Sequence, residues 1–413
     1  MTGTSIDGID IAAVRISGRG LKARATLLGQ TSAQLGELTA RLRAAQRQEP
    51  LTAGAFTALA RDLAIAHLPP LRELARIHGK PDLIALHGQT LFHKPPLSLQ
   101  LIDASIVAQD FGCNVVSNLR AADLAAGGQG APITPLSDWM MFRSKSSCRA
   151  VVNLGGFSNA TILPSEPLAV GNSFPTPSDK RAAWIDGIRG FDLCLCNQLL
   201  DHISRTMANI PFDMDGRLAL SGRVNPSALE PLQILLDQQH RSGRSLGTTD
   251  EIVAQAATHL SGVSPSDALA TAAQAIAQTI AQTIAQTIAQ TIAQSISAAI
   301  AIDTSAKQRP HAIQVLFAGG GVRNAGLMDA LRRAIKSSGS WKSSVRTTDD
   351  YGVPSDARET IAMALLGVLA TDGVSITLPA VTGRQAIRAI DGAFLRVPEH
   401  QFTQSSHKLG APE

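Results

Sequence analysis

The amino-acid sequence predicts an α/β protein built from two domains, and two observations carry this prediction. The chain has 413 residues and a mass of 43.3 kDa, which is long for one small domain. Short apolar runs end repeatedly at polar turns that contain glycine, as strands do at the carboxyl edge of a sheet, where ligands collect. Hydrophobic residues make up 44% of the chain, enough to bury a sizeable core.

The expected elements follow from local patterns in chain order. A polar turn at the start leads into a short β-branched strand over residues 11–16, and helices are expected over 31–45 and 51–77. Further apolar runs that lead into polar turns cover residues 82–86, 113–117, 150–154 and 314–318. Their recurrence indicates that strands and helices alternate along the chain.

Two segments look like additions to this framework. Residues 165–186 are rich in Pro, Ser and Asn and are expected to form a surface insertion. Residues 278–294 contain four successive Gln-Thr-Ile-Ala units. A period of four drifts by about 40° per unit around a helix, so the Ile row is expected to wind around the axis. A tandem expansion of one helix is the favoured interpretation, with a coiled-coil partner helix as the alternative.

Composition excludes several classes of protein. Aromatic residues are only 4% of the chain and the formal charge is +4 without a Lys/Arg block, which argues against a nucleic-acid surface. The four cysteines do not form a disulfide framework, and the Cys194-x-Cys196 spacing is not that of a metal site, so no metal-ligating residues are expected. No targeting or membrane-spanning segment is evident, which predicts a cytoplasmic protein.

Two glycine-containing turns, far apart in the chain, are candidates for binding phosphate. Small and hydroxylated residues allow backbone N–H groups to approach an anion, and the second turn also opens a helix. Neither turn has the Gly-Lys-Ser/Thr ending of a Walker A loop. Asp7 or Asp10 could hold Mg²⁺ through water. The residues concerned are Gly3, Thr4, Ser5, Ile6, Asp7, Gly8, Ile9 and Asp10 in the first turn, and Gly319, Gly320 and Gly321 in the second.

Polar residues between these turns are candidates for contacting a small ligand. The planar guanidinium of Arg120 suits a phosphoryl charge, and the carboxylate of Asp192 could act as a general base. Simpler roles remain open for three others: His87 as a hydrogen-bonded turn residue, Asp123 as a helix cap and Glu359 as a solvated helical residue. The full set is His87, Gln89, Arg120, Asp123, Asn153, Asn159, Asp192 and Glu359.

The chain resembles the anhydro-N-acetylmuramic acid kinase family, within the superfamily of acetate and sugar kinases, Hsp70 and actin. The resemblance extends from residue 1 to about residue 393 and rests on motifs that occur in the family's order. These motifs are MTGTSIDGID, LIALHGQTLFHKPP, LRAADLAAGGQGAPITP, VVNLGGFSNAT, RGFD, FDMDGRLALSGRV, FAGGGVRN and TTDDYGVPSDARETIAMALLG.

The resemblance implies a two-domain actin-like ATPase (ribonuclease H-like) fold with an interdomain cleft. Domain I would comprise residues 1–135 and 383–413, and domain II residues 136–382. Members of this family use ATP, Mg²⁺ and water to convert 1,6-anhydro-N-acetylmuramic acid to N-acetylmuramic acid 6-phosphate during peptidoglycan recycling. A carboxylate-activated water opens the anhydro bridge at C1 while O6 attacks the γ-phosphate. A homodimer is a further expectation from the family.

The same resemblance implies roles for individual residues. Asp192 falls on the catalytic aspartate of the family, and Arg120 is expected to act with it. His87, Gln89 and Glu359 are expected to contact the sugar. The two glycine-containing turns, from Gly3 to Asp10 and from Gly319 to Gly321, are expected to bind ATP.

The sequence departs from the family pattern at four places. Met1 stands inside the first turn, which an apolar strand precedes in the family, so backbone groups of the neighbouring strands are expected to lack partners. Thr-Gly-Pro-Gly after the catalytic aspartate is replaced by residues 193–196, Asp-Phe-Arg by 118–120, and a basic run by 239–245. These departures leave two alternatives open: a non-catalytic binding homologue, and a kinase for a related amino sugar.

Overall fold

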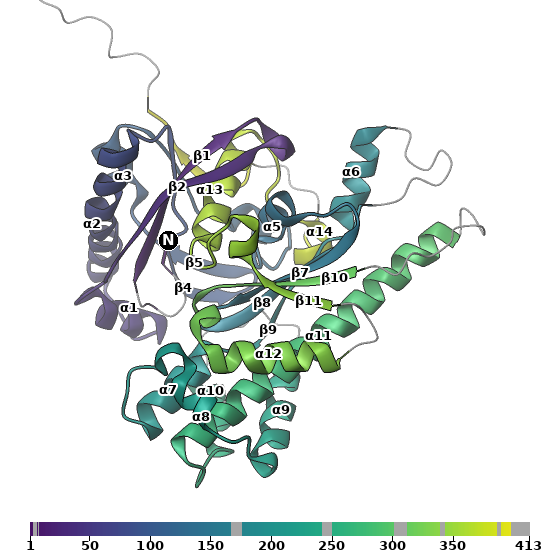
Figure 1. Cartoon of the computed structure of the whole chain (residues 1–413). Helices are drawn as coiled ribbons and strands as arrows, with labels where there is room; N and C mark the ends of the chain where they lie inside the picture. The colour runs from purple at the N-terminus through teal and green to yellow at the C-terminus, as the bar shows by residue number, and fades with distance from the viewer. Residues whose placement is uncertain are drawn as a thin grey trace, which may run out of the picture.

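The computed structural model in Figure 1 describes residues 1–2, 6, 8–166, 176–241, 250–300, 312–338, 343–385 and 390–397. Within these ranges it is a mixed α/β protein, as expected from the sequence. None of the helices in the described ranges is both long and apolar enough to span a membrane.

The central sheet has five strands in the order β11-β10-β7-β8-β9. Strands β7, β8 and β9 form an antiparallel meander, and β10 and β11 run parallel to β7. This order and these directions are those of a ribonuclease H-like sheet, so the expected fold is confirmed by topology. The strands are β7 (Ser147–Leu154), β8 (Phe157–Leu163), β9 (Arg189–Leu195), β10 (Ala312–Ala318) and β11 (Ser343–Thr347).

Helices cover both faces of the central sheet. One face contacts α9, α11 and α12, and a large apolar core lies between them and the strands. The other face contacts α5 and α14, with a second core that also includes residues of α13. The helices are α5 (Pro135–Phe142), α7 (Asn197–Met207), α8 (Arg217–Ser221), α9 (Pro226–Arg241), α10 (Asp250–Thr258), α11 (Pro265–Ile300), α12 (Ala325–Ser337), α13 (Arg358–Thr371) and α14 (Pro379–Thr382).

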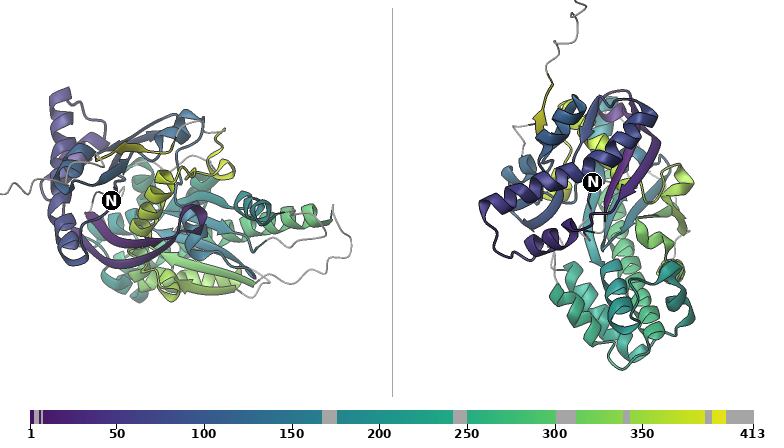
Figure 2. Two further views of the ribbon diagram at one scale, coloured as in Figure 1. Left: turned by 90° about the horizontal axis from the view of Figure 1, so that it is seen from above. Right: turned by 90° about the vertical axis from the view of Figure 1, so that its left-hand side faces the viewer.

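The N-terminal part has smaller sheets. Strand β1 pairs antiparallel with β2, β4 with β5, and β6 lies between β3 and β12. Figure 2 shows α2 on the outside of this part, with α7–α12 at the opposite end of the molecule. The elements are β1 (Ile9–Ser17), β2 (Arg24–Ala33), α1 (Leu38–Gln46), α2 (Ala53–His78), β3 (Leu83–Ala85), β4 (Gln89–Lys94), β5 (Leu97–Leu101), α3 (Ala104–Phe111), β6 (Asn114–Ser117), α4 (Ala121–Ala125) and β12 (Ala393–Leu395).

Helix α13 joins the two parts of the molecule. It contacts β1, β2 and β3 of the N-terminal part and α5 beside the central sheet. Four short 3₁₀ helices, η1 (Gly20–Lys22), η2 (Met214–Gly216), η3 (Gly320–Arg323) and η4 (Thr348–Tyr351), shape turns between elements. The first residue of α13, Arg358, is fully buried, so this helix carries charge into the middle of the molecule.

The strands expected at glycine-containing turns are confirmed as β1, β3, β6, β7 and β10, and the helix expected over 51–77 is α2. The helix expected over 31–45 is wrong at its start, because residues 31–33 belong to β2 and the helix begins at Leu38. Thr31 and Ala33 pair with Ile11 and Ile9 of β1, and this tertiary pairing overrides the local helical pattern.

The chain on both sides of the N-terminal turn forms a hydrogen-bonded pair. The Met1 amino group donates to the carbonyl of Asp10 at 2.6 Å, and the Asp10 N–H donates to the carbonyl of Met1 at 2.8 Å. Thr2 Oγ1 donates to the carbonyl of Gly88 at 3.1 Å. These contacts hold the described residues of the turn between β1 and the loop that follows β3.

The Gln-Thr-Ile-Ala repeat lies in α11, which α7, α8, α9 and α12 surround. Ile280, Ile284 and Ile288 are all at most 3% exposed, so the expectation that the Ile row leaves the packed face is wrong over these three units. Both rows turn by the same angle, and the drift is visible in the Ala row, because Ala281 is buried and Ala289 is exposed. The surrounding helices give α11 an apolar face wide enough to keep the Ile row covered.

The expected surface insertion over 165–186 is described only in part. Residues 167–175 lie outside the described residues, and residues 177–186 form α6 (Pro177–Asp186). The helix begins with a capping box, in which Thr176 Oγ1 accepts from the Asp179 N–H and the Asp179 carboxylate accepts from the Thr176 N–H.

Candidate active site

The register of the central sheet places three of the candidate polar residues in one row. Asn153 of β7 lies opposite Asn159 of β8, which in turn lies opposite Asp192 of β9. Directly opposed residues of antiparallel strands share a face of the sheet. The Asn153 side-chain amide donates to Glu359 Oε1 at 3.3 Å, so this face is directed toward the first turn of α13.

Arg120 approaches the same place from the N-terminal part, immediately before α4. Its guanidinium donates to the carbonyl of Gly130 at 2.9 Å and to His87 Nε2 at 2.9 Å. Burial lowers the pKa of Arg120 to about 10, and the nearby carboxylates of Asp192, Glu359 and Asp123 oppose this shift. The guanidinium therefore stays protonated at neutral pH, with its Nε unpartnered among the described residues.

His87 positions Arg120. Because Arg120 donates to Nε2, the ring carries its proton on Nδ1 and donates it to the carbonyl of Gly88 at 2.9 Å. Burial, with a contribution from the charge of Arg120, lowers the pKa of His87 to about 3, so the ring is neutral at physiological pH. Both ring nitrogens are engaged within the protein. This arrangement matches the simpler interpretation of His87 as a hydrogen-bonded turn residue.

Gln89, two residues on, is fully buried at the start of β4. Its side-chain amide donates to the carbonyl of Thr90 at 3.3 Å. Its side chain is therefore enclosed by the protein next to the loop residues 87 and 88 in the chain.

Glu359 is a half-buried carboxyl near both acidic and basic neighbours. Its pKa is raised, mainly by burial and also by the charges of Asp138 and Asp10, while Arg358 and Arg120 act in the opposite direction. Glu359 is thus a helical residue that is partly shielded from solvent, and its carboxylate also accepts from Asn153. Its placement between these charges results from the position of α13 between the two parts of the molecule.

Asp123 is fully buried and holds the loop that contacts Arg120. Its carboxylate accepts from the Gly130 N–H at 2.7 Å and from Thr382 Oγ1 at 2.7 Å, and it lies 3.6 Å from the guanidinium of Arg384. Asp123 is therefore more than a helix cap, because its carboxylate joins the 127–130 loop to α14. Asp123 acts on Arg120 through the carbonyl of Gly130.

The second glycine-containing turn lies against the end of β7. Gly319 has a φ of 86°, and a Cβ there would lie 2.7 Å from Asn153 Oδ1. A Cβ at Gly321 would lie 2.6 Å from the Cβ of Leu154, whereas a Cβ at Gly320 would meet only Asn197 Nδ2 at 3.9 Å. Gly319 and Gly321 are thus required by packing. Gly320 alone leaves open space in which another molecule could approach the backbone.

The first turn is described only in part, because Gly3, Thr4, Ser5 and Asp7 lie outside the described residues. The side chains of Ile6 and Ile9 are buried in the N-terminal core, so only their backbone could reach a ligand. Ile6 has a φ of 53°, a conformation that β-branched residues rarely adopt. Gly8 packs close to the Ala33 carbonyl of β2, since a Cβ there would lie 3.1 Å from that oxygen.

The carboxylates present fit Mg²⁺ held jointly with phosphates. No cluster of three or more His, Cys, Asp or Glu side chains in the described ranges could hold a metal by protein ligands alone. Mg²⁺ usually binds one or two carboxylates together with phosphate oxygens and water. Asp10 is exposed, and its charge contributes to the raised pKa of Glu359, so the Asp10 carboxylate suits that arrangement.

The replaced segment after Asp192 lies in the core. Leu193, Cys194, Leu195 and Cys196 are each 0% exposed and pack among helices of the α11 side. Burial raises the pKa of the Cys194 thiol to about 12, so it is not a reactive nucleophile at neutral pH.

The other two replaced segments lie apart from this core. Asn118 adopts a φ of 52°, which Asn tolerates well. The side chains of residues 239–245 lie outside the described residues.

Sequence reasoning missed a buried ion pair beside the candidate site. Arg358 Nε donates to Asp138 Oδ1 at 2.8 Å, Arg358 Nη2 contacts Asp138 Oδ2, and both side chains are at most 1% exposed. Thr161 Oγ1 donates to the same carboxylate at 2.7 Å. Arg358 adjoins Glu359 and lies inside the motif TTDDYGVPSDARETIAMALLG, and these were the available signals. Asp138 lies in an apolar helix and gave none.

The buried histidines predict how stability depends on pH. Burial lowers the pKa of His67 and His87 to about 3 from the ordinary 6.5. The unfolded chain therefore binds protons near pH 6.5 that the folded chain does not, and a fall in pH below 6.5 favours unfolding. We expect the free energy of unfolding, measured with urea, to decrease steadily from pH 7 to pH 5. In His67→Gln the decrease should be shallower, and a wild-type value that rises toward pH 5 would contradict the assignment.

The central sheet is ribonuclease H-like, and its candidate site combines carboxylates, an arginine and a glycine-containing turn. This combination is typical of phosphotransferases. The sequence matches the family described as anhydro-N-acetylmuramic acid kinase over residues 1–395. The chain therefore belongs to the anhydro-N-acetylmuramic acid kinase family.

Curated relatives agree with this assignment, and three that carry the name anhydro-N-acetylmuramic acid kinase illustrate it. The protein of Acaryochloris marina is 33% identical over 407 residues, covering 93% of this chain and 95% of the relative. That of Synechococcus elongatus is 30% identical, with 96% and 98% covered, and that of Bordetella pertussis is 33% identical, with 95% and 94% covered.

Two solved structures illustrate a distant resemblance. A hexokinase matches with a TM-score of 0.34 and 14% identity, covering 89% of this chain and 86% of that one. A ROK family glucokinase from Streptomyces griseus, solved with glucose and AMPPNP, matches with a TM-score of 0.33 and 14% identity, covering 86% and 99%. Scores this low carry no argument, so the fold assignment rests on strand order and direction.

Proposed function

We propose that this protein phosphorylates 1,6-anhydro-N-acetylmuramic acid with ATP while water opens the anhydro bridge, giving N-acetylmuramic acid 6-phosphate and ADP. Membership of the family supports the reaction. The structural observation that carries it is the Asn153–Asn159–Asp192 row, in which Asn153 lies against Gly319 and donates to Glu359, while the charges of Asp192 and Glu359 act on Arg120. The product would return a peptidoglycan sugar to metabolism in the cytoplasm.

Asp192 has the role of general base in this proposal. It takes a proton from water, the water oxygen bonds to C1 of the sugar, and the bond between C1 and O6 breaks. O6 then bonds to the γ-phosphorus as the bond from that phosphorus to the β–γ bridging oxygen breaks, and ADP leaves with that electron pair. Its position in the row with Asn153 and Asn159 supports this role, because Asn153 donates to Glu359 of α13 and the charge of Asp192 acts on Arg120.

Arg120 has the role of stabilising the charge on the transferred phosphoryl group. It remains protonated, and its Nε has no partner among the described residues, so it retains a donor for a ligand. His87, which faces Arg120 through Nε2, positions it for the sugar and phosphate. Gln89 and Glu359 have sugar-binding roles in this proposal.

The two glycine-containing turns have the role of binding ATP. Mg²⁺, held by Asp10 with the phosphates, would neutralise part of the phosphate charge. The proposed division into domains places this nucleotide between residues 1–135 with 383–413 and residues 136–382. The pairing of β12 with β6 supports the return of the chain to the first domain. A homodimer stays a prediction.

Substrate dependence tests the proposed function. ADP formation should require 1,6-anhydro-N-acetylmuramic acid and should be at least tenfold slower with N-acetylmuramic acid, which lacks the bridge, or with glucose. ADP formation at equal rates with glucose, or none with the anhydro sugar, would reject the proposal. A ranking that favours a different anhydro amino sugar would instead support the alternative of a related substrate.

The open space at Gly320 predicts a defect confined to nucleotide binding. Gly320→Ala adds a methyl group where the protein has room, so stability should be retained while the KM for ATP rises on the order of tenfold, equivalent to about 1.4 kcal/mol. Gly319→Ala and Gly321→Ala should unfold at lower urea concentration, because their methyl groups overlap β7. An unchanged KM in Gly320→Ala would place the nucleotide elsewhere.

A further inference from the structure

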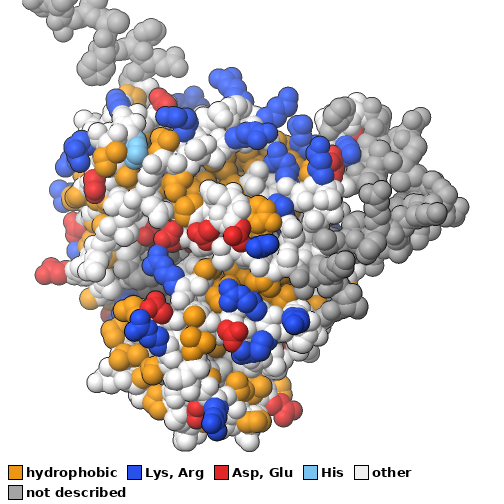
Figure 3. Space-filling view, in the orientation of Figure 1, with side chains coloured by type: hydrophobic (Ala, Val, Ile, Leu, Met, Phe, Trp, Pro, Cys, Tyr) orange, Lys and Arg blue, Asp and Glu red, His pale blue; other side chains and the backbone are white. Residues whose placement is uncertain are grey.

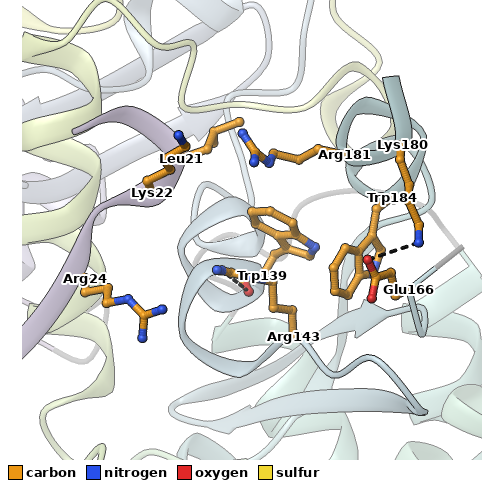
Figure 4. A pocket seen from close by; sticks show the side chains of 9 residues that line it. All are labelled: Leu21, Lys22, Arg24, Trp139, Arg143, Glu166, Lys180, Arg181 and Trp184. Carbon is orange, nitrogen blue, oxygen red and sulfur yellow. Dashed lines mark hydrogen bonds and ion pairs between the residues drawn. The ribbon is translucent and has the colours of Figure 1, made fainter. Parts of the chain in front are cut away.

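A pocket of about 430 Å³ lies between the β1–β2 hairpin, α5 and α6. Figure 4 shows basic side chains entering it from the hairpin and from α6, with two tryptophans between them. None of the residues given a role in the proposed reaction lines it. The lining residues are Leu21, Lys22, Arg24, Trp139, Arg143, Glu166, Lys180, Arg181 and Trp184.

Positive charge dominates the pocket. Five of its side chains are basic, and its one acid, Glu166, pairs with Lys180 at 3.2 Å. The pKa of Arg143 is lowered by burial and by the charges of Arg24 and Arg181. Three guanidinium groups therefore repel one another, and an anion between them would relieve the repulsion. Figure 3 shows Lys and Arg side chains gathered along the upper edge of this face, near the hairpin.

The two tryptophans of the pocket are held in a defined arrangement. Trp139 and Trp184 pack edge to face with ring centroids 5.4 Å apart, and the Arg143 guanidinium stacks over the Trp139 ring at 4.5 Å. Trp139 is 1% exposed. Its indole N–H has no hydrogen-bond partner among the described residues, whereas that of Trp184 donates to the carbonyl of Pro164 at 2.8 Å. A buried donor without a partner is costly, and a ligand oxygen would satisfy it.

We propose that this pocket binds a small phosphorylated molecule that carries a ring. Guanidinium groups bind phosphate through paired, charge-assisted hydrogen bonds. The edges of Trp139 and Trp184 line the pocket, and the indole N–H of Trp139 supplies a neutral donor for the ring's substituents. The volume accommodates a nucleotide or a sugar phosphate, and both present the same chemistry of phosphate joined to a ring.

Tryptophan fluorescence tests the proposal directly, because Trp341 is the only tryptophan outside the pocket. The full chain carrying Trp341→Phe is titrated with ATP, with N-acetylmuramic acid 6-phosphate and with pyrophosphate. We expect a saturable change with at least one ring-bearing phosphate, and weaker binding of pyrophosphate. The first two probes distinguish a nucleotide from a sugar phosphate, and pyrophosphate binding as tightly as either would overturn the role of the ring.

A charge-matched pair of variants separates the pocket from general attraction to anions. Arg24→Gln with Arg181→Gln should weaken the fluorescence-detected binding at least tenfold. Arg205→Gln with Arg332→Gln removes the same charge from exposed sites on α7 and α12 and should leave binding within twofold. Equal weakening in both double variants, equal affinity in all three proteins, or the absence of a saturable change with every probe would each overturn the proposed site.

Discussion

Asp192→Asn is expected to lower turnover of 1,6-anhydro-N-acetylmuramic acid by about 10²- to 10⁴-fold, the usual contribution of a general base. The amide keeps the size of the carboxylate but cannot accept the proton of the attacking water. Stability should change little, because Asp192 lies on the sheet face directed toward α13 and not in the apolar core behind it. Turnover is measured as ADP release, and stability is measured by urea denaturation of the same preparation. The two measurements separate a loss of catalysis from a loss of stability.

A matched substitution provides the control for this prediction. Asp186→Asn makes the same chemical change on an exposed residue at the end of α6 and should leave turnover within twofold. If Asp192→Asn retained wild-type turnover, the general base would have to be another group. If it lost activity and unfolded at markedly lower urea concentration, its role would be structural.

Asp138→Asn is expected to have the largest effect on stability, lowering the free energy of unfolding by about 3–5 kcal/mol. The substitution leaves the Arg358 guanidinium charged, fully buried and without its counter-ion. Thr161 would also lose its carboxylate acceptor. Equilibrium urea denaturation, followed by circular dichroism, measures the loss.

The exposed ion pair between Arg323 and Asp356 serves as a control for the buried Asp138–Arg358 pair. Its side chains are 73% and 42% exposed, and surface pairs contribute about 0–1 kcal/mol. Arg323→Gln should therefore cost far less than Asp138→Asn. Equal losses in the two variants would show that burial does not govern the Asp138–Arg358 pair.

Local sequence was enough to predict the strands that end in glycine turns, because an apolar β-branched run and the turn after it are both local features. It failed for β2, β8 and β9, where polar residues such as Thr31, Asn159 and Asp192 interrupt the apolar pattern. Pairing with neighbouring strands stabilises these segments, and no local pattern records that pairing. The resemblance to a family, and not periodicity, singled out Asp192 as catalytic.

The sequence predicted which residues belong to the candidate site better than it predicted how they contact one another. Arg120, His87 and Glu359 were all candidates, but that His87 accepts from Arg120 depends on how two loops pack. The Asp138–Arg358 pair joins residues 220 positions apart, and the basic pocket draws on the β1–β2 hairpin, α5 and α6. Sites assembled from distant, individually ordinary residues leave no motif in a sequence.

Isotope labelling tests the proposed reaction most directly. The reaction is run with ATP and 1,6-anhydro-N-acetylmuramic acid in water enriched in ¹⁸O, and the product is analysed by mass spectrometry. If a water activated by Asp192 attacks C1 while O6 takes the γ-phosphoryl group, one ¹⁸O atom appears on C1 and the phosphate on O6 contains none. Label found in the phosphate, or a phosphorylated product whose bridge is still closed, would contradict this account.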